Sequence, residues 1–340
     1  VNRLDAVSLR QFALFALGLN NMSQENTRSN MEKNRTITSV CWKLLERGGN
    51  QSIQLVVQIV MARILTPKEF GALAIMLVFI NIGNVIVTSG LSTALVQTEE
   101  VDDSDFSTVF WMSLGASAIL FTTLFVAAPT LSTFYGMPTI ASPLRVLGLL
   151  FLITAFNSVQ VAIVQREMQF RKVFNATIVS VLVSGVIGIA VALAGAGLWA
   201  LILQQLVYQV TNCFVLGLQV RWAPSFVFES AKAWKLFSYG WKLLVSGLLD
   251  QGYQSLSDLI IGKQFSASSL GLVSQGKKYP QAVGGMLDGA IQPVMLSAVS
   301  RVQTDASQVK HLVRRALKTS TFLIVPSMTL FAVAAKSIVG

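Results

Sequence analysis

The side chains best suited to do chemistry are amides that interrupt long apolar stretches. Gln51, Gln54 and Gln58 follow one another at i, i+3 and i+7, which places all three on one face of an α-helix. Asn84 lies in the next apolar stretch. Polar side chains inside a membrane turn toward protein or toward a water-filled cavity rather than toward lipid. This stripe therefore indicates either hydrogen bonds between helices or the wall of a hydrated cavity.

A second polar stripe occurs 200 residues later, at Gln251, Gln254 and Asp258. The tetrapeptide Trp42–Leu45 likewise recurs as Trp241–Leu244. Because polar positions coincide in the two copies, the sequence favours an internal repeat whose stripes line a hydrated cavity. Amides and a carboxylate both suit sugar hydroxyls, which donate and accept hydrogen bonds.

Five charged residues lie within the apolar stretches or at their predicted cytoplasmic ends. An ionisable group at membrane depth is a functional candidate, and Asp250, Asp258 and Asp288 are candidates for coupling to an ion or for structural pairing. Lys43 and Lys242 occupy equivalent positions in the two copies. They attract a phosphate as point charges, or they snorkel to the lipid headgroups.

The composition determines the class of protein. Of the 340 residues, 53% are hydrophobic and 12% are charged, about half the charged fraction of a soluble domain. The chain is therefore expected to be a membrane protein that contacts membrane lipids. The net charge of +10 is attributed to membrane topology rather than to nucleic-acid binding, because the cations lie between apolar stretches and not on one polar face.

Nine stretches are long and apolar enough to cross a membrane as helices. The expected fold is all-α: a polytopic helical membrane protein with about nine transmembrane helices. The expected spans are 40–65, 70–97, 107–134, 140–165, 173–196, 198–220, 237–263, 272–299 and 318–337.

The distribution of Lys and Arg predicts a cytoplasmic N-terminus. With the N-terminus inside, 19 of the 26 Lys and Arg residues fall on the inner side. The two copies of the repeat begin the first and seventh spans, six spans apart, so both copies run the same way, as in a transporter built from two parallel bundles. The predicted parts are a polar cytoplasmic tail (1–39), a first six-helix bundle (40–220), a cytoplasmic connector (221–236) and three helices of a second bundle (237–340). The second bundle is expected to be C-terminally incomplete.

The sequence offers little for catalysis. The single histidine, His311, lies in a basic polar stretch, so the sequence indicates neither a His/Cys metal cluster nor a Ser/His/Asp constellation. The phosphate-binding pattern G-x-x-x-x-G-K-[ST] does not occur. We therefore expect no catalytic residue, no metal, no cofactor and no nucleic-acid partner.

Four segments together resemble one known family. They are Ala62–Gly71 (ARILTPKEFG), Gln165–Lys172 (QREMQFRK), Asp258–Lys263 (DLIIGK) and Leu270–Ser274 (LGLVS). The resemblance is to the polysaccharide-transport flippases of the multidrug/oligosaccharidyl-lipid/polysaccharide exporter superfamily.

The resemblance implies a multi-pass protein of the bacterial inner membrane with twelve to fourteen helices in two bundles. The implied activity moves undecaprenyl-pyrophosphate-linked oligosaccharide repeat units to the periplasmic leaflet for O-antigen, capsule or exopolysaccharide synthesis. The implied partners are the lipid-linked oligosaccharide, a polysaccharide polymerase and chain-length or export machinery. Two alternatives stay open: a cation-coupled drug exporter or lipid II flippase, and a membrane polysaccharide polymerase or glycosyltransferase.

Overall fold

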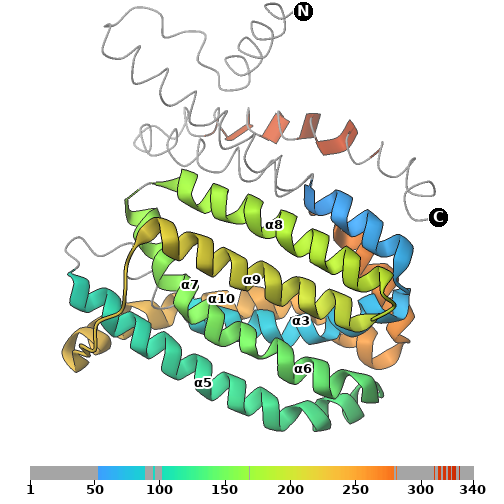
Figure 1. Ribbon diagram of the computed structural model, residues 1–340, viewed down its shortest axis with the longest axis horizontal. Helices are drawn as coiled ribbons and strands as arrows, with labels where there is room; N and C mark the ends of the chain where they lie inside the picture. The colour runs from blue at the N-terminus through green and yellow to red at the C-terminus, as the bar shows by residue number, and fades with distance from the viewer. Residues whose placement is uncertain are drawn as a thin grey trace, which may run out of the picture. The chain divides into compact units, whose positions relative to one another are not determined.

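The structure is a computed structural model that describes residues 53–88, 102–167 and 169–278, with isolated residues at 95, 281 and between 310 and 329. Within these ranges every regular element is a helix (Figure 1). A helix over Ile53–Ile64 comes first, and a helix over 267–278 comes last. Between them lie α3 (Pro67–Thr88), α5 (Asp103–Phe134), η2 (Pro138–Ile140), α6 (Ala141–Leu147), α7 (Leu149–Arg166), α8 (Phe170–Leu193), α9 (Leu198–Val220) and α10 (Ser230–Gln264).

Five described segments are long and apolar enough to cross a membrane, which confirms the prediction of an all-α, multi-pass membrane protein. In lipid a helix satisfies its backbone hydrogen bonds internally, and this requirement explains the absence of strands from the described part. The five segments are Pro67–Thr88, Asp103–Phe134, Pro138–Arg166, Arg171–Leu193 and Leu198–Val220.

The bundle has two ends, which the helix connections define. The turn end carries the short turns after Ile53–Ile64, α5, α8 and α10, at the right of Figure 1. Gly195 and Gly197 make one of these turns with φ of 82° and 55°, a region that favours glycine. The connector end, at the left, carries the segment between α9 and α10. The positive-inside prediction would place the connector end in the cytoplasm.

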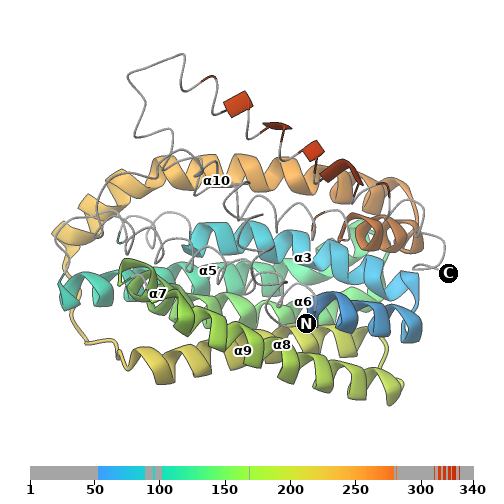
Figure 2. The ribbon, with the colours of Figure 1, turned by 90° about the horizontal axis from the view of Figure 1, so that it is seen from above.

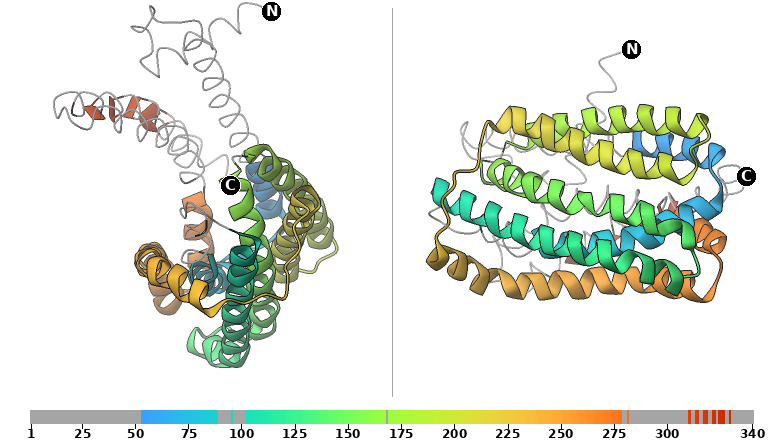
Figure 3. Two further views of the ribbon diagram at one scale, coloured as in Figure 1. Left: turned by 90° about the vertical axis from the view of Figure 1, so that its left-hand side faces the viewer. Right: turned by 60° about the horizontal axis from the view of Figure 1, so that its bottom comes forward.

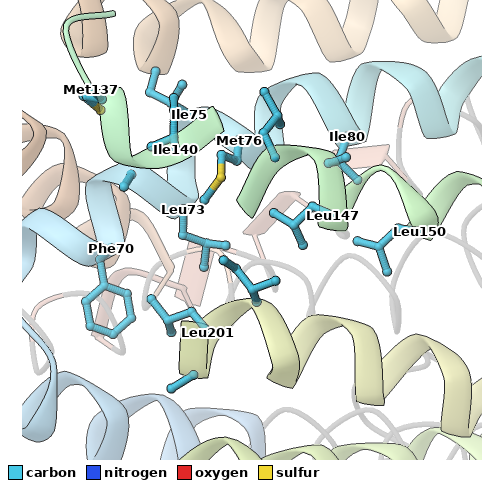
Figure 4. Close-up of a cluster of buried hydrophobic side chains, with 14 of the residues drawn as sticks. Phe70, Leu73, Ile75, Met76, Ile80, Met137, Ile140, Leu147, Leu150 and Leu201 are labelled. Atoms are coloured by element: carbon cyan, nitrogen blue, oxygen red, sulfur yellow. The ribbon is translucent and has the colours of Figure 1, made fainter. Parts of the chain in front are cut away.

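Apolar packing is densest near the turn end. Phe70, Leu73 and Met76 of α3 are buried against the η2–α6 segment and α9 (Figure 4). Lipid tails are as apolar as these side chains, so such packing stabilises the bundle by close van der Waals contact more than by removal from water. The residues that α3 meets include Met137, Ile140, Leu147, Leu150 and Leu201.

A proline inside α5 is compensated by a cation from α6. Pro129 has no N–H, so the carbonyl of Phe125 loses its partner one turn earlier. Arg145 supplies it: its Nε donates to that oxygen at 3.1 Å, and its guanidinium lies 4.6 Å from the centre of the Phe125 ring. A backbone group freed at membrane depth is thus satisfied by a neighbouring helix.

α10 begins within the predicted connector. Irregular structure covers 221–229 and the helix starts at Ser230, so the last part of the predicted connector (221–236) is helical. Ala233 and Lys232 are strong helix formers, and no glycine or proline follows Pro224 before Gly240. α10 runs alongside α3 and α5 (Figure 2).

Candidate functional site

The two copies of the sequence repeat fold into the same local structure. One helix ends at Ile64 and the next begins at Pro67; α10 ends at Gln264 and the next helix begins at residue 267. The break therefore recurs at the offset of 200 residues that the polar stripes have.

Each break carries its own helix cap. The backbone N–H of Thr66 donates to Glu69 Oε2 at 2.7 Å, and its hydroxyl donates to the same oxygen at 2.9 Å. At the second break the N–H of Ser269 donates to Ser266 Oγ at 3.1 Å. Both arrangements join a hydroxyl residue before the helix to the residue three positions later, which is the pattern of a helix N-terminus.

The two helices that start at these breaks pack on each other through a pair of glycines. A Cβ placed on Gly71 would overlap the Ala267 carbonyl and lie 3.0 Å from Gly271 N. A Cβ placed on Gly271 would overlap the Pro67 carbonyl and lie 3.0 Å from Gly71 N. Pro67 and Ala267 are themselves equivalent positions of the repeat. The contact is therefore reciprocal, and only residues without a side chain fit at its centre.

Amide side chains join the two copies next to this glycine contact. Gln58 Nε2 donates to Gln275 Oε1 at 2.7 Å, and Gln275 lies one helical turn beyond Gly271. On the other side of the contact, Gly262 packs against Ile75, the equivalent of Gln275. The predicted stripe residue Gln58 is thus half-buried at the junction of the two copies.

The second stripe lies along α10 and satisfies itself within the helix. Gln251 Nε2 donates to Ser255 Oγ at 3.0 Å, and Gln254 Nε2 donates to Asp250 Oδ2 at 2.9 Å. Asp250 and Gln254 are exposed, whereas Asp258 is half-buried.

Two pairs of equivalent polar positions share the same burial. Gln54 and Gln254 are both exposed, and Gln58 and Asp258 are both half-buried. Lys242 is exposed. Three predicted site residues, Lys43, Gln51 and Asp288, lie outside the described residues.

Other polar groups in the helices hold the bundle together. Gln209 Nε2 of α9 donates to Thr154 Oγ1 of α7 at 3.3 Å, and Asn157 Nδ2 of α7 donates to Asn212 Oδ1 of α9 at 3.1 Å. These are the interhelical hydrogen bonds expected of amides in a bundle. The predicted site residue Asn84 is half-buried, and its Oδ1 has no hydrogen-bond partner in the described part of the chain.

At the connector end a single lysine of α10 faces three carboxylates. Lys232 Nζ lies 3.3 Å from Glu229, 3.7 Å from Asp102 and 3.9 Å from Asp105, and it donates to Ser104 Oγ at 2.6 Å. Desolvation lowers the pKa of Lys232, but the hydrogen bond and charge of Glu229 and the charges of Asp105 and Asp102 outweigh it and raise that pKa above its ordinary value. The lysine therefore stays protonated at neutral pH.

Hydroxyl and aromatic groups attach the rest of the connector to the start of α5. Trp111 Nε1 donates to the Ser225 carbonyl at 2.9 Å, and the hydroxyls of Ser107 and Ser225 lie 2.8 Å apart. Phe226 stacks on Trp111 with ring centres 5.4 Å apart. Figure 3 (right) shows the connector passing from α9 across the end of α5 to α10. We call Lys232, its carboxylate partners and these α5–connector contacts the connector clamp.

The sequence alone did not predict the clamp or a second lysine contact. Lys263 Nζ donates to the Phe134 carbonyl in the last turn of α5 at 2.5 Å, and it lies 3.8 Å from the centre of the Phe134 ring. A cation at a helix C-terminus is favourable because the last carbonyls lack partners there. One signal for the clamp is present in the sequence: residues 99–105 include five acidic side chains, and the start of α10 carries Lys232 and Lys235.

The sequence of the chain is similar to those of three proteins of polysaccharide biosynthesis or transport. The chain is 26% identical over 295 residues to the succinoglycan biosynthesis transport protein ExoT of Rhizobium meliloti, an alignment that covers 86% of this chain and 60% of ExoT. It is 27% identical to the teichuronic acid biosynthesis protein TuaB of Bacillus subtilis, covering 55% and 39%. It is 21% identical to the lipopolysaccharide biosynthesis protein WzxC of Escherichia coli, covering 82% and 57%.

The chain thus spans three fifths or less of the length of each of these relatives. No solved structure matches. Residues 60–340 match one family over most of the chain, and that match includes both helix breaks and the glycine contact between them. This chain belongs to the family of polysaccharide biosynthesis proteins.

Proposed function

We propose that this protein is a flippase that moves undecaprenyl-pyrophosphate-linked oligosaccharide repeat units across the bacterial inner membrane. The observation that carries the proposal is the reciprocal contact of the two breaks, because it relates two copies of one structural unit within a polysaccharide biosynthesis protein. Equivalent units facing each other suit a transporter whose halves alternate between two arrangements.

The relatives support the substrate class without naming one glycan. ExoT is named for transport in succinoglycan biosynthesis, TuaB for teichuronic acid and WzxC for lipopolysaccharide. The element common to these names is a saccharide polymer. The proposed cargo is accordingly defined by its lipid-linked form.

The proposed cargo-facing surface is the polar face of α10 together with its repeat partner. Gln54, Asp250 and Gln254 are exposed, and polar side chains within a membrane-spanning segment face protein or a water-filled cavity rather than lipid. Their amide and carboxylate groups can bind sugar hydroxyls, and Asp250 and Asp258 are the described candidates for ion coupling. Lys242 is the described candidate for attracting the pyrophosphate.

A strain that lacks the gene tests the activity. We expect lipid-linked repeat units to accumulate in the inner leaflet and surface polysaccharide to be lost, provided that no paralogue is present. Normal surface polysaccharide in such a strain would contradict the proposal. Chain extension by the purified protein would instead favour a polymerase or glycosyltransferase.

Paired variants test the polar face. Replacing Gln54 and Gln254 together by Leu should reduce transport while the amount of folded protein stays unchanged. The matched control is Gln209→Leu, which removes an amide that bonds α7 and should act on stability first. Unchanged transport in the Gln54/Gln254 variant would assign those amides to packing.

A further inference from the structure

We propose that the Gly71–Gly271 contact is the closing surface of the transporter at the turn end, which parts when cargo leaves and re-forms afterwards. This inference rests on the proposed function, because it assigns a moving part to the flippase.

The first argument is the shape of the contact. At its centre the backbone of one repeat copy meets the backbone of the other, with each glycine against the residue that begins the opposite helix. A surface without side chains requires no rotamer to be ordered when it closes. Small residues also let two helices approach closely in a membrane.

The second argument is that the backbone of another helix, and not a side chain, fills the space at this contact. A Cβ on Gly83, Gly185 or Gly262 would also overlap a neighbour, but that neighbour is a side chain. Gly115 of α5 and Gly252 of α10 are also helical glycines, yet a Cβ on either would meet nothing within 4 Å. Glycine is therefore not required wherever it occurs in these helices. Gly71 and Gly271 differ because another backbone fills the space that a side chain would need.

The third argument is the kind of force across the contact. Dispersion between closely packed atoms is weak for each pair of atoms and is lost when the surfaces part. The side-chain hydrogen bond Gln58–Gln275 lies beside the contact and joins two amides that can each bond to water instead. Opening would thus expose Gln275, whose amide can bond to water.

Accessibility of Gln275 tests the proposal. In the full-length protein with Cys41→Ser, Cys213→Ser and Gln275→Cys, a membrane-impermeant maleimide is applied to membrane vesicles from either side. Adding Gly71→Ala or Gly271→Ala should raise labelling from the turn-end side by about tenfold, because overpacking opposes closure. The two variants should have similar effects, because their contacts are reciprocal.

The matched controls are Gly115→Ala and Gly252→Ala in the same background, which should label like the parent. Labelling of the Gly71 and Gly271 variants that equals the controls would overturn the inference. This readout does not depend on the cargo: failure of the proposed function would appear as normal surface polysaccharide in the deletion strain, whatever the labelling shows.

A cross-link keeps the inference testable if the alanine variants fail to fold. Pro67→Cys and Ala267→Cys leave both glycines in place and lie at equivalent positions beside the contact. Joining them with a flexible, reducible bifunctional thiol reagent should stop transport, and reduction should restore it. Undiminished transport with the bridge in place would contradict a closing surface at this position.

Discussion

The two ends of the bundle are held together by different physical forces. At the turn end, Gly71 of α3 and Gly271 of the helix after α10 let two backbones touch, because neither residue has a side chain. At the connector end, the clamp holds Lys232 among three carboxylates and stacks Phe226 on Trp111. The first contact is sensitive to volume, and the second is sensitive to charge and hydrogen bonding.

This difference indicates how the helices can part at one end of the bundle without parting at the other. A neutral packed contact is little affected by salt, whereas added salt screens partly exposed ion pairs such as those of Lys232. Each end can therefore be perturbed separately.

The largest effect is expected from volume at the turn end. Gly271→Leu places a branched side chain where Pro67 already lies, so transport should fall by more than about tenfold while protein remains in the membrane. Gly252→Leu on α10, where space is open, is the control. Equal transport by the two variants would show that the turn end does not depend on volume.

The next effect tests whether charge also matters near the turn end. Arg145→Leu leaves the Phe125 carbonyl without a partner beside Pro129, and an unsatisfied buried backbone group costs about 1–3 kcal/mol. The midpoint of thermal unfolding in detergent should fall, and a Pro129→Ala background should recover part of the loss. No change in the midpoint would mean that water or another group satisfies the carbonyl.

A smaller effect is expected at the connector end. Lys232→Met removes the cation from among Glu229, Asp102 and Asp105, so the connector should be cleaved severalfold faster by a protease added from that side. High salt should accelerate cleavage of the parent protein toward the rate of the variant. The labelling of Gln275→Cys from the turn end should not change. A change in that labelling would show that the two ends are coupled.

The smallest effect is expected from the aromatic part of the clamp. Trp111→Phe keeps a ring against Phe226 but loses the hydrogen bond to the Ser225 carbonyl, a cost of about 1 kcal/mol. Cleavage of the connector should rise less than in Lys232→Met. A larger effect than that of Lys232→Met would place the main strength of the clamp in its aromatic contacts.

Much of the fold could be predicted because it depends on local pattern. Apolar runs identify spans, and the offset between Gln58 and Asp258 revealed the repeat whose two breaks the structure shows. The start of α10 at Ser230 lies before the apolar part of the predicted span 237–263, so hydropathy alone does not mark it.

The pairings within the site could not be predicted. Spacing places Gln54, Gln58 and Gln254 on helix faces. Which helix packs against each face depends on the tertiary structure, and local spacing does not predict it. Gln58 therefore bonds Gln275 across the repeat, while Gln254 bonds Asp250 within its own helix. Gly71 and Gly271 lie 200 residues apart, the offset of the two polar stripes, yet their mutual contact depends on the crossing of two helices.

One measurement tests most directly whether the two ends move independently. Spin labels on Lys68→Cys and Ser268→Cys report the turn end, and labels on Asp103→Cys and Trp234→Cys report the connector end; all four positions are exposed. Gly271→Ala should lengthen the distances of the first pair alone, and Lys232→Met should broaden those of the second pair alone. Distances that change together in either variant, or in neither, would contradict the account.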